Sequence, residues 1–199
     1  MRIITARFLA AVFSSLILVS FTLISGTLAQ TDPTREVQAR YAECNALEKI
    51  GKPLEFQRAQ EGNDLSAWEK RKPRDDIYEL MRVHLASNRV RSVRLEQTSA
   101  SGDWSSLTTY CFRASGTLAF KFQTLRTFYH SEVPGMDVLE VELRSYFSPN
   151  GKNFKNLEKQ RNGVGNKPVN TTYMRNGGPD FPTSSSVVKT VGAKLLPAK

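Results

Sequence analysis

Apolar and polar residues alternate strictly in one segment of the chain, 139–144, and this period of two constrains the fold more than any other feature. At 139–144, Leu, Val and Leu occupy the odd positions, whereas Glu, Glu and Arg occupy the even positions. Successive side chains of a β-strand point to opposite faces, so the pattern predicts a strand with one face buried and the other in water. Less regular runs at 93–96, 104–113 and 118–122 predict neighbouring strands. We therefore expect an antiparallel β-meander of about five strands.

Two of the turns between these runs share one sequence pattern. Phe112 is followed four residues later by Gly116, and Phe147 is followed four residues later by Gly151. A Pro-Asn pair precedes the second glycine, which is typical of a tight turn that ends in a residue with positive φ. The pattern predicts the same aromatic-flanked hairpin at two places in the meander.

The alternation changes phase within one of the predicted strands. Up to Phe122 the apolar residues stand at even positions, and from Leu125 they stand at odd positions. An extra residue in one strand, a β-bulge, shifts the phase in this way. We therefore expect a β-bulge near Gln123.

One clear helix is predicted ahead of the strands. Asp32 can cap it, Pro33 suits its first turn and Gly51 can end it. Apolar positions at 77–85 also have helical spacing, so a second short helix is expected there, after a polar connecting segment at 52–76. The predicted fold class is α+β, with one or two N-terminal helices packed on the antiparallel meander.

The first residues have the pattern of a cleavable signal peptide. Arg2 and Arg7 precede an apolar stretch at 8–24, and small residues follow it. This predicts cleavage between Ala29 and Gln30. An uncleaved membrane anchor is the alternative, because the stretch is close to the spanning minimum of about 17 residues. The Ser and Thr residues within the stretch favour cleavage, and the mature protein is then periplasmic or secreted, without a transmembrane segment.

Three parts of the chain are predicted from these patterns. Residues 1–29 form the signal peptide, and residues 30–161 form a single α+β domain. The remainder, 162–199, is polar and rich in Gly, Pro and Ser, with few apolar residues to bury. We expect this remainder to be a flexible tail or one that lies loosely on the domain.

The mature chain contains two cysteines, Cys44 and Cys111. Exported proteins meet an oxidising environment, so a disulfide bond between them is expected. Closing so long a loop contributes about 4 kcal/mol in the loop-entropy model. The alternative is a pair of buried thiols that act as small apolar side chains.

The charge balance of the mature chain is basic. Removal of Arg2 and Arg7 with the leader lowers the 28 basic residues to 26, against 19 acidic residues, which leaves a net charge of +7. This excess favours anionic partners such as envelope polymers, acidic lipids or nucleic acid, but it specifies none of them. The basic residues are scattered rather than gathered in one stripe, so an ordinary solvated surface is the alternative, and no specific nucleic acid is expected.

Catalytic and metal-binding motifs are scarce in this sequence. His84 and His130 are the two histidines and have no ligand spacing, so neither a metal nor a cofactor is predicted. No nucleophile elbow and no phosphate-binding glycine loop is present. A small hydrolase that uses His130, Glu140 and Glu142 is one hypothesis. The alternative is that both glutamates face water and pair with Arg126 or Arg144.

Five aromatic residues of the predicted strands are candidates for ligand binding. A curved sheet can use such side chains to line a groove, or it can bury them as core. The candidates are Trp104, Tyr110, Phe112, Phe120 and Phe122. We therefore expect an exported, non-catalytic binding or interaction protein, whose partner is an unidentified envelope component or protein. A hydrolase and a binder of anionic polymers are the alternatives.

Overall fold

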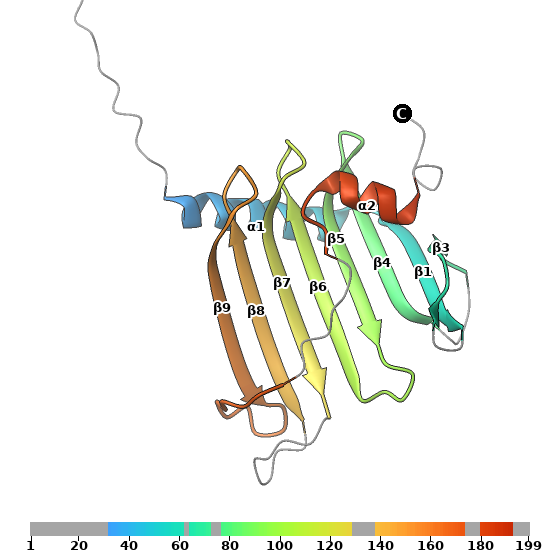
Figure 1. Cartoon of the computed structure of the whole chain (residues 1–199). Coiled ribbons are helices and arrows are strands. Elements are labelled where there is room, and N and C mark those ends of the chain that lie inside the picture. Colours follow the sequence, from blue (N-terminus) through green and yellow to red (C-terminus); the bar gives the residue numbers. More distant parts are fainter. Residues whose placement is uncertain (1–31, 62–63, 73–76, 129–137, 174–179, 193–199) are drawn as a thin grey trace, which may run out of the picture. The chain divides into compact units, whose positions relative to one another are not determined.

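The computed structural model describes residues 32–61, 64–72, 77–128, 138–173 and 180–192 (Figure 1). The predicted cleavage site at Ala29 and Gln30 lies outside the described residues, and so does His130. The elements follow in the order α1 (Pro33–Ile50), β1 (Leu54–Glu61), β2 (Asp64–Leu65), β3 (Glu69–Lys70), β4 (Ile77–Ala86), β5 (Arg89–Thr98), β6 (Trp104–Phe112), β7 (Leu118–Thr127), β8 (Leu139–Phe147), β9 (Asn153–Asn162) and α2 (Ser184–Val191).

The strands form one antiparallel sheet. Within the described ranges it has nine strands, in the order β2-β1-β4-β5-β6-β7-β8-β9, and the short β3 pairs with β1. From β4 to β9 each strand pairs with the next one in the chain, which confirms the predicted meander and the α+β class. The prediction of about five strands was too low, because the segments that form β1 to β4 do not show a clean period of two.

The segment 77–85, predicted as a helix, is strand β4. It lies between β1 and β5 and buries side chains on both faces, Met81 and Val83 on one and Leu80 and His84 on the other. A strand that is buried on both faces has apolar residues at adjacent positions, and these imitate helical spacing. The two-residue turn Ser87–Asn88 has φ values of 50° and 58° and joins β4 to β5.

The polar stretch at the start of the sheet differs from prediction, and the one at its far end forms an edge strand. The segment 52–76, expected to be a connection, contains β1, β2 and β3, and Phe56 of β1 is buried in the core. Strand β9 is almost entirely exposed and lies at the edge of the sheet, where its neighbouring strand is β8. Such an edge strand is held by backbone hydrogen bonds to one neighbour. Because its side chains are hardly buried, its sequence does not alternate between apolar and polar residues.

The predicted bulge near Gln123 is absent. The register runs without a shift through Gln123, which is opposite Thr108 on one side and Leu143 on the other. The apolar residues change phase because β7 packs on two different partners. Phe120 faces α1, whereas Leu125 belongs to a separate apolar cluster on the opposite face of the sheet.

The two turns predicted to be alike have the same backbone geometry. In the first, the Gly116 amide donates to the Arg113 carbonyl at 2.9 Å, and in the second the Gly151 amide donates to the Ser148 carbonyl at 2.9 Å. The φ values of the glycines are 90° and 84°. A one-residue register shift adjoins each turn, between Cys111 and Phe112 and between Tyr146 and Phe147. This confirms the repeated hairpin.

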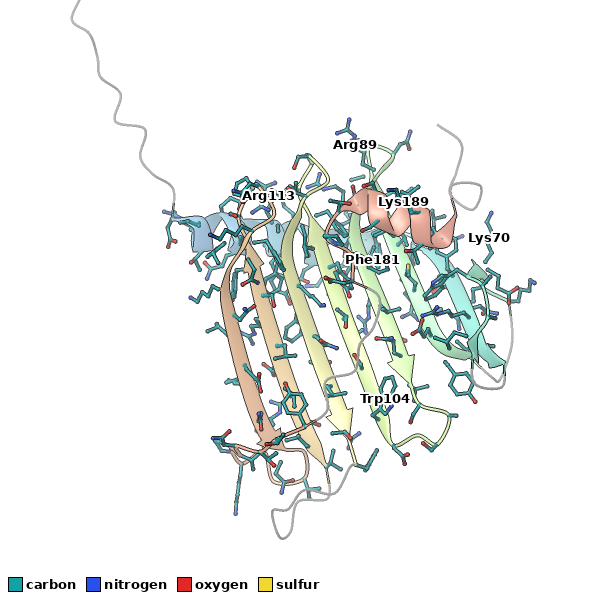
Figure 2. All side chains as sticks on the ribbon, viewed as in Figure 1. Lys70, Arg89, Trp104, Arg113, Phe181 and Lys189 are labelled. Atoms are coloured by element: carbon teal, nitrogen blue, oxygen red, sulfur yellow. The ribbon has the colours of Figure 1, made fainter. Side chains whose placement is uncertain are left out.

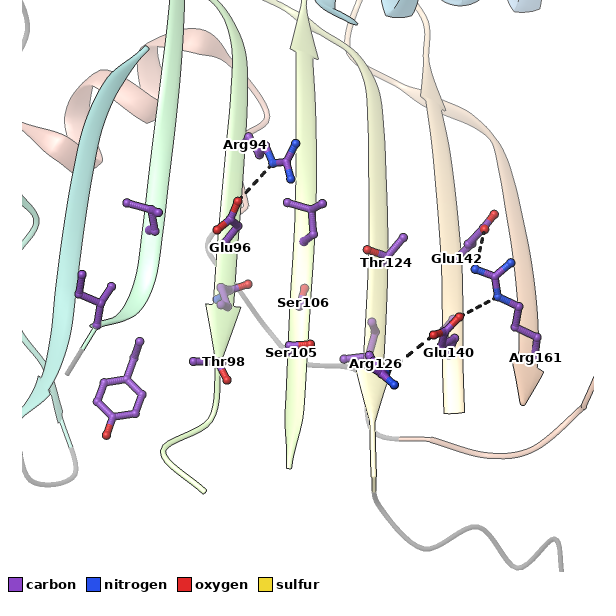
Figure 3. A pocket seen from close by; sticks show the side chains of 17 residues that line it. Arg94, Glu96, Thr98, Ser105, Ser106, Thr124, Arg126, Glu140, Glu142 and Arg161 are labelled. Carbon is purple, nitrogen blue, oxygen red and sulfur yellow. Dashed lines mark hydrogen bonds and ion pairs between the residues drawn. The ribbon is translucent and has the colours of Figure 1, made fainter. Parts of the chain in front are cut away.

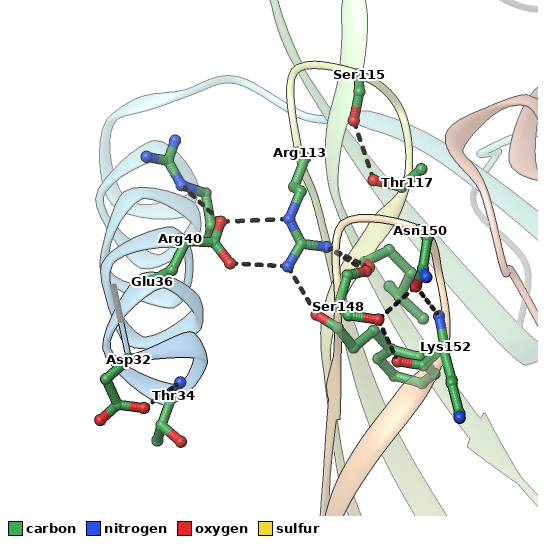
Figure 4. Close-up of polar contacts among 12 residues, drawn as sticks. Asp32, Thr34, Glu36, Arg40, Arg113, Ser115, Thr117, Ser148, Asn150 and Lys152 are labelled. Atoms are coloured by element: carbon green, nitrogen blue, oxygen red, sulfur yellow. Dashed lines mark hydrogen bonds and ion pairs between the residues drawn. The ribbon is translucent and has the colours of Figure 1, made fainter. Parts of the chain in front are cut away.

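One arginine ties both hairpins to α1 (Figure 4). The guanidinium of Arg113 donates to both carboxylate oxygens of Glu36 on α1, at 3.2 and 2.8 Å. It also donates to the carbonyls of Leu118, Phe147 and Ser148 at 2.8, 2.7 and 3.3 Å. Because Arg113 is buried, this fork fixes the position of α1 relative to both turns.

Each helix covers one face of the sheet, α1 behind it and α2 in front in the view of Figure 1. We call these the α1 face and the α2 face. On the α1 face, Val37 and Cys44 pack against Cys111, Phe120 and Tyr146. The helices cover only the end of the sheet where the turns of the β4–β5, β6–β7 and β8–β9 hairpins lie. In each of these hairpins the register shifts by one residue near the turn. Among the described residues, no helix combines the length and the apolar character that crossing a membrane requires.

The C-terminal segment was predicted to be a loose tail, and its described part packs on the α2 face. Phe181, Val187 and Val191 are buried in the main core cluster. Figure 2 shows Phe181 beneath α2 and Trp104 toward the opposite end of the sheet. The Ser184 amide donates to the Gly116 carbonyl at 2.8 Å, which joins this segment to the β6–β7 turn. A capping box between Thr183 and Ser186 begins α2, and the composition alone did not reveal it.

Candidate functional site

A hollow of about 660 Å³ lies on the α1 face at the end of the sheet that α1 leaves uncovered (Figure 3). We call it the trough. Its side chains come from six consecutive strands, β4 to β9. The residues that line it include Tyr78, Leu80, Arg94, Glu96, Thr98, Ser105, Leu107, Thr124, Arg126, Glu140, Glu142 and Arg161.

The sheet register places these side chains in two rows. In the first row, Thr98, Ser105, Arg126, Glu140 and Arg161 are successive cross-strand partners from β5 to β9. Directly opposite residues point to the same face and lie about 5 Å apart, so the row forms a continuous polar surface across five strands.

The second row lies two residues further along each strand. Glu96, Leu107, Thr124 and Glu142 are successive partners from β5 to β8. The leucine provides an apolar spot between hydroxyl and carboxylate groups. The two rows together present hydrogen-bond donors and acceptors side by side.

Ion pairs hold the charged groups at the β8–β9 side of the trough. Glu140 contacts Arg126 at 3.8 Å and Arg161 at 2.9 Å. Glu142 contacts Arg144 at 3.1 Å and Arg161 at 3.6 Å. The glutamates therefore have the arginine partners that the sequence predicted for a solvent-facing strand.

A second ion-pair chain borders the trough on the β4–β5 side. Glu96 contacts Arg94 at 3.3 Å and is also paired with Arg82. Arg82 reaches Glu55 at 3.0 Å. Burial opposes ionisation of Glu55, but hydrogen bonds from Arg82 and Arg71 outweigh it and lower the pKa of that carboxyl. The charged groups of the trough are thus paired, and its three arginines and three glutamates balance.

Two of the three residues of the hydrolase hypothesis lie in the described part of the chain. Glu140 and Glu142 share the trough wall, as their spacing in one strand predicted. His130 lies outside the described residues. Within the described ranges, no group of three or more His, Cys, Asp or Glu side chains is arranged to hold a metal ion.

No protein-family model, no curated protein and no solved structure matches this chain.

The five aromatic candidates do not line one groove. Tyr110 and Phe112 are buried in the core on the α2 face. Trp104 points to the same face and packs beside the cluster of Leu125, Leu139 and Val141. Phe120 and Phe122 point to the α1 face, where they line a second, smaller hollow beside α1.

The two cysteines lie in one buried cluster but are not bonded. The structure holds Cys44 and Cys111 as free thiols, so the predicted disulfide bond is not present in it. Cys44 donates to the carbonyl of Arg91 at 3.5 Å. A hydrogen bond with Cys44, together with burial, raises the pKa of the Cys111 thiol.

His84 has a packing role, on a strand rather than on the predicted helix. It is buried on β4, in the cross-strand row that contains Ser92 and Cys111. Burial lowers the pKa of its imidazole. The neutral form therefore predominates near neutral pH, which suits a side chain covered by the end of α1.

Sequence reasoning missed most of the residues that form the trough. It identified Glu140 and Glu142, but not the polar residues of β5, β6 and β7 that share their face. The signal that could have identified them is the set of polar residues that alternate with apolar residues in each strand. These polar residues can be assigned to one site only when the register between the strands is known.

Proposed function

We propose that this chain is an exported, non-catalytic binding protein of the cell envelope or extracellular space, and that the trough is its binding site. The observation that supports this most is a hollow of about 660 Å³ with two rows of positioned polar side chains. Small-ligand sites commonly have volumes of about 300–1,000 Å³. The trough also lies at the end of the sheet that neither of the two described helices covers.

The pairing of charges in the trough favours an uncharged, hydroxyl-rich ligand such as a glycan chain. Guanidinium groups donate hydrogen bonds, carboxylates accept them, and hydroxyl groups of Thr and Ser do both. A sugar hydroxyl can bond to both members of an ion pair. A polyanion must instead approach Glu96, Glu140 and Glu142, so the overall basic charge is a weaker guide to the ligand than the local balance.

Binding to a glycan array tests this proposal. The exported protein is applied to neutral, carboxylated and sulfated glycans at low and at high salt. We expect binding to neutral glycans that changes little with salt, because no net charge is neutralised in the trough. Thr124→Trp places a bulky ring in the trough and should weaken this binding by about tenfold or more, the effect of losing about 1.4 kcal/mol.

The control variant is Thr172→Trp, at an exposed position outside the trough lining. It should bind as the unmodified chain does. Binding restricted to sulfated glycans, with a steep loss at high salt, would instead support an anionic polymer as ligand. Release of new reducing ends from a bound glycan would support the hydrolase, and an array without any bound glycan would refute the proposed ligand class.

Export is expected to be accompanied by oxidation of the two thiols. Cys44 and Cys111 share one apolar cluster between α1 and the sheet, which is the packing that supports this proposal. Mass spectrometry of the protein isolated from its natural host should show Gln30 as the first residue and a mass lower by two hydrogen atoms. Unfolding the same sample without reductant should leave both sulfur atoms resistant to alkylation.

The bond should stabilise the folded chain by about 4 kcal/mol relative to the reduced form. A chain that keeps residues 1–29, or that alkylates at both Cys44 and Cys111 when unfolded without reductant, would contradict this part of the proposal. Urea unfolding of the oxidised and reduced forms measures the difference.

A further inference from the structure

A second hollow, of about 260 Å³, lies where α1 meets β7 and β8. We call it the aromatic hollow. Its lining residues are Val37, Gln38, Tyr41, Phe120, Phe122, Arg144 and Tyr146. An engineered apolar cavity of about 150 Å³ is large enough to bind benzene, so this hollow has room for an aromatic ring or a short hydrocarbon chain.

Aromatic rings form most of the wall of this hollow. The ring of Tyr41 meets that of Phe120 edge to face at 4.9 Å, and Phe120 meets Tyr146 in the same way at 5.1 Å. These contacts fix the rings from the helix side and from the sheet side. An apolar group that enters would displace water from surfaces that are already in place, which costs little reorganisation.

Two cationic side chains stand beside the rings. The Arg144 guanidinium carbon lies 5.6 Å from the centre of the Phe122 ring, and the Lys155 Nζ lies 5.6 Å from the centre of the Tyr146 ring. Both residues point to the α1 face, as the register of β8 with β9 shows. A ligand with a negative group at one end meets complementary charge at the wall of the hollow.

Arg144 can turn to such a ligand at small cost. Its carboxylate partner is Glu142 at 3.1 Å, and the Arg144 side chain is 44% exposed. Ion pairs this exposed contribute about 0–1 kcal/mol. Glu142 also contacts Arg161 at 3.6 Å, so it keeps a cationic partner when Arg144 moves.

We propose that the aromatic hollow is a second binding site, for a small amphipathic carboxylate with a short acyl or aryl group. The apolar group lies among Tyr41, Phe120 and Phe122, and the carboxylate accepts hydrogen bonds from Arg144. This site is separate from the trough, since its wall is aromatic and lies against α1. The proposal for this site therefore does not depend on the glycan proposal, and the two are tested separately.

Titration of the purified protein with octanoate and with octan-1-ol tests the site. Both probes have the same hydrocarbon chain, but only octanoate carries a charge. We expect octanoate to bind about tenfold more tightly than the alcohol, the effect of one hydrogen bond to a charged group. Arg144→Gln should remove that preference and leave the weaker, charge-independent binding of both probes.

Two tryptophan variants of α1 separate binding in the hollow from binding elsewhere. Gln38→Trp fills the mouth of the hollow and should abolish binding of both probes. Ala39→Trp is its matched control, because Ala39 is exposed on the same helix and does not line the hollow. Equal affinity for the two probes in the unmodified chain, unchanged octanoate binding in Gln38→Trp, or absence of octanoate binding would overturn the proposal.

Discussion

Replacement of Arg113 by Ala is expected to lower the free energy of unfolding by about 3 kcal/mol. The substitution leaves the Glu36 carboxylate without its bidentate partner and removes the donor to the carbonyls of Leu118, Phe147 and Ser148. Breaking a buried ion pair by removing one partner costs about 3–5 kcal/mol, and the lower end applies because Glu36 stays partly in contact with water.

Urea unfolding at equilibrium measures this effect, with two further variants beside it. Arg113→Lys should recover only a small part of the loss, because an ammonium group lacks the planar fork that reaches the carboxylate and the carbonyls together. Arg89→Ala, at the exposed first residue of β5, should change stability by less than about 0.5 kcal/mol. A loss below about 1 kcal/mol for Arg113→Ala would show that the two hairpins do not depend on this arginine.

Replacement of Phe181 by Ala is expected to have the largest effect of any single truncation in the C-terminal segment. The side chain is 1% exposed and meets the ring of Tyr110 edge to face at 5.1 Å. Truncating a buried phenylalanine costs about 3–5 kcal/mol, from the lost transfer free energy and the cavity that remains. Thermal or urea unfolding of the variant measures the loss.

The control for this variant is Val164→Ala in the same part of the chain. Val164 is 71% exposed, so its truncation should leave stability nearly unchanged. A Phe181→Ala chain as stable as the unmodified one would mean that residues 180–192 do not form part of the core. In that case this segment would lie loosely on the domain, as the composition predicts.

The sequence predicts those parts of the fold in which one strand face is buried and the other is wet. Strand β8 shows this directly, and the two glycine turns follow from the residues that accept positive φ. The first helix was also predictable, because Asp32 and Pro33 mark its start and Gly51 marks its end. Prediction from neighbouring residues in the sequence is sufficient where each side chain is either fully buried or fully in water.

Elements that depend on distant partners were not predictable in this way. Strand β4 is covered on both faces, so its apolar residues resemble a helical pattern. Strand β9 has almost no buried side chain, so only the glycine turn before it indicated a strand there. Helix α2 has only eight residues, and packing of Val187 and Val191 on the sheet stabilises it more than its own propensity does.

The candidate site shows the same division between local and long-range information. Glu140 and Glu142 were identified because they are close in one strand. Thr98, Ser105 and Arg161 come from three other strands and join them through the pairing register. The aromatic candidates were divided between two faces because neighbouring positions of a strand point in opposite directions.

The binding function of the trough is tested most directly by mapping the bound ligand with backbone amide chemical shifts. The protein is titrated with the neutral glycan that binds best on the array. We predict the largest shift changes at Thr98, Ser105, Thr124 and Arg161, in the two polar rows of the α1 face. Changes concentrated on the α2 face around Trp104, or along the exposed edge of β9, would contradict the assignment of the trough as the binding site.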